Sequence, residues 1–146
     1  MKKELIIGIA GVALSVFGFF VANGNKKKSL LDETMKDVDT SKLTISKSDA
    51  QDIANRLYLA MKDMGTDETA IENMLLKEHN LSSEDMKLIV SAFGTKKYGK
   101  FGAPMFEWMG GDDLDLRGWL YRECSDSLYE KLNIKFKQAG FTAGTK

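Results

Sequence analysis

Residues 5–22 form an unbroken run of eighteen residues without a charged side chain or a proline. As an α-helix rising about 1.5 Å per residue, this run would reach about 27 Å, close to the roughly 30 Å hydrocarbon core of a bilayer. Lysines bound it on both sides, at positions 2 and 3 before it and at positions 26–28 after it. The pattern predicts that residues 1–25 are a single-pass transmembrane anchor.

Two other interpretations of this run stay open. A buried core helix usually shows polar residues on its outer face, whereas this run offers only Ser15. A cleaved signal peptide also begins with lysines and an apolar stretch, but the residues at the exit, FFVAN at 19–23, are a poor match to a cleavage site.

The small residues of the run recur at steps of three and four, so on a helix they share one face. In lipid, a face of small residues lets neighbouring helices approach closely and associate, although membrane helices are also generally rich in glycine. This spacing favours self-association or packing against other envelope proteins. The residues of this face are Gly8, Gly11, Ser15, Gly18 and Ala22.

Charge limits what the rest of the chain can bind. Residues 29–146 carry 16 basic and 20 acidic side chains, a formal charge of about −4. Nucleic-acid affinity comes chiefly from Lys and Arg neutralising phosphates, so we expect no nucleic-acid partner and no unaided adhesion to anionic lipid. The single cysteine, Cys124, excludes an internal disulfide, and with the single histidine, His79, it is a thin basis for a catalytic pair.

Residues 26–47 have the polar composition of a linker, and residues 48–146 have the pattern of a helical domain. Within the predicted linker, only a few apolar side chains offer docking points to the domain. They are Leu30, Leu31, Met35, Val38, Leu43 and Ile45.

Five helices are predicted in the domain, with no convincing alternation of period two. We expect caps at Ser48, Thr66, Ser82 and Ser125, and a fourth helix that begins within residues 112–115. The fold class is therefore all-α: an N-terminal membrane helix followed by a compact five-helix domain. The expected core residues are Ile53, Leu57, Ala60, Met61, Met64, Ile71, Met74, Leu75, Met86, Ile89, Val90, Phe93, Leu116, Trp119, Leu120, Leu128, Leu132 and Phe136.

The segment MKDMGTDE at 61–68 resembles the loop that opens an annexin repeat. Residues 70–71, 92–100 and 115–125 also resemble the corresponding parts of that repeat, so the resemblance spans about residues 49–140. It implies a five-helix fold and a single repeat of the bacterial or bacteriophage type. An insertion of about a dozen residues near 101–114, and Asp63 in place of the first loop glycine, depart from the pattern.

The resemblance also implies a calcium site, although no cofactor is otherwise expected. Its ligands would be the backbone carbonyls of Met61, Asp63 and Gly65 and the carboxylate of Glu123, since Ca²⁺ takes six to eight oxygen ligands. The run at 65–68 is equally a helix stop followed by a cap, which explains the same residues without a metal.

A second acidic cluster follows Gly110 and Gly111. Asp112, Asp113 and Asp115 have the oxygen ligands for a hard cation, but they are more simply the negative charge at the start of the fourth helix.

The insertion is rich in aromatic residues. Such side chains cover a core as a lid, or they form a partner interface, where Trp, Tyr, Phe and Met are enriched. The candidate interface residues are Tyr98, Phe101, Phe106, Trp108 and Met109.

The leading functional hypothesis is a non-enzymatic, membrane-anchored structural or adaptor protein, such as a virion or envelope component that links a bilayer to a protein shell. A calcium-dependent phospholipid-binding module is the alternative. A cell-wall-acting enzyme is a third class, for which Glu107 or Glu123 would be the acidic residue.

Overall fold

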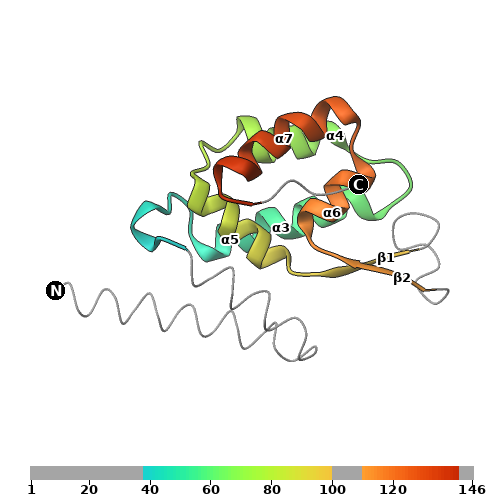
Figure 1. Ribbon diagram of the computed structural model, residues 1–146, viewed down its shortest axis with the longest axis horizontal. Helices are drawn as coiled ribbons and strands as arrows, with labels where there is room; N and C mark the ends of the chain where they lie inside the picture. The colour runs from blue at the N-terminus through green and yellow to red at the C-terminus, as the bar shows by residue number, and fades with distance from the viewer. Residues whose placement is uncertain (1–37, 100–109, 142–146) are drawn as a thin grey trace.

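The computed structural model describes residues 38–99 and 110–141, and in them five helices and a small two-stranded hairpin form the domain (Figure 1). The prediction of five helices is confirmed, and the prediction of a domain without strands is wrong. The elements are the 3₁₀-helix η1 (Thr40–Lys42), α3 (Lys47–Lys62), α4 (Glu68–Glu72) with the π-helical turn η2 (Asn73–Lys77), α5 (Ser83–Phe93), β1 (Lys96–Gly99), β2 (Gly111–Leu114), α6 (Leu116–Glu123) and α7 (Asp126–Gln138).

The core lies where α3 and α5 pack against each other and against α4, α6 and α7. Trp119 of α6 is fully buried at its centre, and its ring meets those of Tyr58 and Tyr98 edge to face, with centroids 5.5 and 5.0 Å apart. Such pairs add to the gain from burying apolar area. The expected core residues are all buried except Ala60, which is partly buried, and Met64.

Met64 is 86% exposed because α3 ends at Lys62, so the helical spacing that predicted its burial no longer applies there. The helix starts also differ in two places. Ser46, not Ser48, caps α3 through a capping box with Asp49, and Asp67, not Thr66, caps α4. The predicted caps at Ser82 and Ser125 are confirmed.

The hairpin replaces the expected helical start at residues 112–115. Asp112 and Asp113 lie in β2, and only Asp115 caps α6, accepting a hydrogen bond from the amide of Gly118 at 2.9 Å. Gly111 pairs with Gly99, and a Cβ on Gly111 would overlap the carbonyl of Tyr98. The close backbone approach therefore requires a glycine at the end of the ladder.

Several predictions concern segments outside the described residues. The anchor at residues 5–22 with its five small residues, and Phe101, Phe106, Glu107, Trp108 and Met109 of the insertion, belong to this group. Among the helices in residues 38–99 and 110–141, none combines the length and the apolar character needed to cross a bilayer.

Candidate functional site

The loop between α3 and α4 lies beside the end of α6. The hydroxyl of Thr66 donates a hydrogen bond to Oε2 of Glu123 at 2.5 Å, across 57 positions of sequence. The hydroxyl of Tyr98 donates to Oε1 of the same carboxylate at 2.6 Å. The structure thus brings together the loop and the acidic residue that the annexin resemblance paired, and hydroxyl donors engage both carboxylate oxygens.

Glu68, just after the loop, also joins two elements. Glu68, in the first turn of α4, accepts hydrogen bonds from the backbone amide and the hydroxyl of Ser125 at 2.6 and 2.9 Å. Ser125 is the N-cap of α7, so Glu68 holds the start of α7 against α4. Asp67 meanwhile accepts a bond from the amide of Ala70 at 3.0 Å. Thr66, Asp67 and Glu68 each therefore have a structural partner.

The other calcium ligands implied by the resemblance lie along the same loop. Met61 is in the last turn of α3 with a buried side chain, Asp63 is the C-cap of that helix, and Gly65 follows with a φ of 91°. Within the described part of the chain, no three His, Cys, Asp or Glu side chains gather as metal ligands do. Calcium binding stays a prediction.

Tyr98 was grouped with the aromatic interface residues, and the structure places it in the core. It is only 8% exposed, its ring packs on Trp119, and the guanidinium of Arg122 lies 5.5 Å above the ring centroid. Tyr98 therefore anchors β1 to α6, while the remaining members of that group lie outside the described residues.

Cys124 lies in the sequence between Glu123 and Ser125, the partners of Thr66 and Glu68, and it is half-buried. Burial, together with the nearby charges of Glu68 and Glu123, raises the pKa of its thiol to about 12. Because the thiolate is the reactive form, the thiol is held in its unreactive state at neutral pH. This environment is the opposite of the electropositive one that activates a catalytic cysteine.

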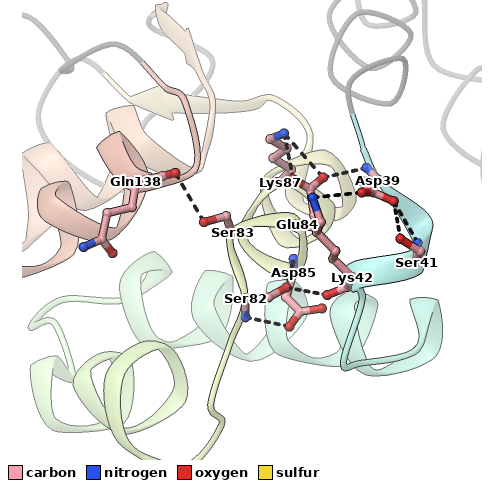
Figure 2. A network of polar contacts seen from close by, with 9 residues as sticks. All are labelled: Asp39, Ser41, Lys42, Ser82, Ser83, Glu84, Asp85, Lys87 and Gln138. Carbon is pink, nitrogen blue, oxygen red and sulfur yellow. Dashed lines mark hydrogen bonds and ion pairs between the residues drawn. The ribbon is translucent and has the colours of Figure 1, made fainter.

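A second polar cluster, at the first turn of α5, was not predicted. We call residues 39–45 the strap and residues 82–85 the α5 turn. Figure 2 shows Asp39, Ser41 and Lys42 of the strap on one side of the α5 turn and Gln138 of α7 on the other. The strap falls within the segment assigned to the linker, and its Leu43 and Ile45 pack against the core, as two of the proposed docking points.

Asp85 is the centre of this cluster and is fully buried. Its carboxylate accepts bonds from the amide and the hydroxyl of Thr44 at 2.8 and 2.5 Å, from the amide of Ile45 at 3.3 Å, and from the amide of Ser82 at 2.8 Å. Burial alone would raise the pKa of Asp85, but the hydrogen bonds from Thr44 and Ser82 outweigh it and lower the pKa. A buried charge is tolerated only with such partners.

Two neighbours of Asp85 extend the cluster. Glu84 accepts a bond from the amide of Asp39 at 2.7 Å and forms an ion pair with Lys87 at 3.0 Å. The hydroxyl of Ser82 donates to the carbonyl of Lys42 at 2.9 Å. The strap is therefore held at its first residue, in its middle and near its end.

The α5 turn also holds the end of α7. The hydroxyl of Ser83 donates to the carbonyl of Gln138, the last residue of α7, at 3.2 Å (Figure 2). The four residues of the α5 turn thus bind both the strap and the last residue of α7.

One signal in the sequence points to the contact between the strap and the α5 turn, namely the aspartate at position 85. Asp85 is the third residue of α5 and forms a capping box with Ser82, which needs one carboxylate oxygen for one backbone amide. The second oxygen of a buried aspartate needs further donors, and a nearby extended segment such as residues 43–45 can supply them.

Compared with known protein families, with curated proteins and with solved structures, the chain matches none of them.

Proposed function

We propose that this chain is a non-enzymatic, membrane-anchored structural or adaptor protein that holds a small helical domain beside a bilayer. The observation that carries the proposal is the apolar run at residues 5–22, bounded by lysines and followed in the same chain by a domain of about 100 residues. In its specific form, the protein is a virion or envelope component that links a membrane to a protein shell.

The use of the acidic side chains supports a structural role. Glu68, Asp85 and Glu123 each bridge two elements that are distant in sequence. For the cell-wall enzyme, Glu123 would have to protonate a substrate, yet its two oxygens accept bonds from Thr66 and Tyr98. This arrangement favours a scaffold over an acid catalyst.

Net charge supports the need for an anchor. A segment with a formal charge of about −4 is repelled by anionic lipid, so the apolar run supplies the attachment. In an annexin-like module this attachment would instead come from calcium, and the contact between Glu123 and the loop at Thr66 is the one observation that favours that alternative.

Deleting residues 2–25 is expected to move the protein from the membrane pellet to the supernatant after alkaline carbonate extraction. The full-length protein should stay in the pellet, and its intact mass should include residues 1–25. If the apolar run were a cleaved signal peptide, the mature protein would lack these residues. Recovery of the full-length protein in the supernatant would contradict the anchor. Adding anionic vesicles to the truncated protein tests the alternative: binding with calcium and release with chelator would favour the annexin-like module.

The small-residue face of the anchor is expected to drive association of several copies. At 100° per residue, Gly11 and Gly18 lie on the face described above and Ala13 lies about opposite. Gly11→Ile or Gly18→Ile should therefore shift the full-length protein in mild detergent from oligomer to monomer, measured by crosslinking and light scattering. Ala13→Ile adds similar bulk and should leave the oligomer intact. Equal behaviour of the three variants would argue against this face.

A further inference from the structure

The strap and the β1–β2 hairpin lie at opposite ends of the domain (Figure 1). The hairpin extends away from the helices, with Gly99 paired to Gly111 at its outer end and Lys96 paired to Leu114 at its base. The strap and the end of α7 lie together at the other end, since both bind the α5 turn. The domain therefore has one end where the chain enters and another that carries the hairpin.

The strap sets the point at which the chain leaves the domain toward the anchor. Without it, the first fixed residue would be Ser46, the cap of α3. With it, the chain is fixed as far back as Asp39, whose amide is bound by Glu84. The carboxylate of Asp85 gives this attachment its strength, because three of its four donors come from Thr44 and Ile45.

The strap is also held by apolar contacts. Leu43 and Ile45 are partly buried against the core, while the intervening Thr44 turns its hydroxyl to Asp85. Releasing the strap would expose both apolar side chains and deprive the buried carboxylate of Asp85 of three of its four donors, and each of these changes costs free energy. The strap is therefore part of the domain.

We infer that the strap orients the domain on its anchor, so that the α5 turn faces the bilayer and the β1–β2 hairpin points away from it. This inference rests on the proposed anchor. Residues 23–37 are the fifteen residues between the apolar run and the described domain, and they span at most about 50 Å when fully extended. The connection is attached at the strap, and the bilayer excludes the domain from its interior, so the end of the domain that carries the α5 turn lies nearer to the membrane than the hairpin does.

The orientation can be measured by energy transfer from the domain to the lipid surface. Full-length protein with Cys124→Ser is placed in nanodiscs that carry an acceptor dye on the lipid headgroups. A donor dye is attached to a single cysteine, introduced either as Gln138→Cys or as Lys97→Cys. Both side chains are exposed, and Gln138 contacts the α5 turn only through its backbone carbonyl. We expect higher transfer efficiency from position 138 than from position 97.

Thr44→Pro tests whether the strap causes this difference. Proline removes both the amide and the hydroxyl that Thr44 donates to Asp85, and the extended backbone of Leu43, with φ −68° and ψ 132°, accommodates a following proline. We expect a smaller difference between the two positions, because the chain would then be fixed only from Ser46 and the connection would be seven residues longer. Ser41→Ala is the matched control, because it removes a bond within the strap, from the Ser41 hydroxyl to Asp39, and none to α5.

The outcomes separate this inference from the proposed function. Protein that does not enter the nanodiscs contradicts the anchor. Protein that enters them but shows equal transfer from both positions, or higher transfer from position 97, overturns the orientation while leaving the anchor standing. Circular dichroism checks that Thr44→Pro keeps its helices; if it unfolds, Thr44→Val, which removes only the hydroxyl, replaces it and should reduce the difference partially. An unchanged difference in the folded strap variant shows that the strap is not its cause.

Discussion

Replacing Trp119 with alanine is expected to lower the free energy of unfolding by about 3–5 kcal/mol, the range typical for large aromatic side chains in a core. Trp119 is fully buried and lies between the rings of Tyr58, Phe93 and Tyr98. Alanine would leave a cavity that these rings, held by α3, α5 and β1, cannot close. Urea titration of the full-length protein in mild detergent, with unfolding monitored by hydrogen exchange of core amides, measures the loss of free energy of unfolding.

Trp119→Phe is the control for this prediction. Phenylalanine keeps most of the ring packing but loses the indole N–H, which donates to the carbonyl of Lys96 at 3.1 Å. We expect a loss of about 1–2 kcal/mol, as for one unpaired buried acceptor with a small cavity. The same contact ties β1 to α6, so exchange at the hairpin amides should rise as well. Equal losses for alanine and phenylalanine would show that packing around Trp119 is not the main contribution.

The core was predictable where a helix buries one face, as α3 does. Ile53, Leu57 and Met61 recur at the spacing of a helix that packs on one side, and the structure buries all three. Met64 continued the same spacing, but spacing alone does not locate the end of a helix. Asp63 already has extended backbone, with a ψ of 170°, so the next residue leaves the face.

The hairpin was not predictable from periodicity. β1 and β2 are four residues each, and their burial does not alternate, since Tyr98 and Gly99 are both buried while Gly111, Asp112 and Asp113 are all exposed. Tertiary contacts fix them instead: Tyr98 reaches Trp119 and Glu123. A strand of this length is too short for a pattern of period two to show.

The loop beside Glu123 was foreseen only through the annexin resemblance, and its hydroxyl donors were not foreseen at all. The contact of Thr66 with Glu123 joins residues 57 positions apart, and nothing local in either segment indicates it. The strap was missed for a related reason. Its composition is that of a linker, and its order depends on Asp85, 41 positions after Thr44. Long-range hydrogen bonds of this kind leave no periodic trace in a sequence.

Asp85→Ala is expected to lower the free energy of unfolding by about 3 kcal/mol, since it removes a charged acceptor from four donors, two of them on Thr44. The strap should become labile before the rest of the domain unfolds, so exchange at the amides of Thr44 and Ile45 should rise most. Hydrogen exchange of the full-length protein in detergent, read by mass spectrometry, measures both effects.

Asp49→Ala is the matched control. Asp49 occupies the same place in a capping box, the third residue of α3, but it is exposed and its hydrogen bonds reach only Ser46. Removing it should weaken the start of α3 and leave the exchange of the α5 turn unchanged. If Asp49→Ala and Asp85→Ala had equal effects, the capping box alone, and not the strap, would account for the role of Asp85.

The same carboxylate should make the strap sensitive to acid. The pKa of Asp85 in the folded protein lies below its ordinary value of 3.8, because the hydrogen bonds of Thr44 and Ser82 outweigh the opposing effect of burial. A group with a lowered folded pKa contributes its full stability above the unfolded pKa and loses it as the pH falls through the folded pKa. The contribution of Asp85 is therefore complete at neutral pH and is lost only below about pH 4.

Asp85→Asn should remove this part of the acid dependence, because asparagine does not titrate and keeps one of the two acceptors of the side chain. At pH 7 the variant should be less stable than the unchanged protein, and the gap should narrow as the pH falls below 3.8. Urea midpoints of both proteins at a series of pH values measure the gap. A gap that stays constant down to strongly acid pH would mean that the charge of Asp85 does not hold the strap.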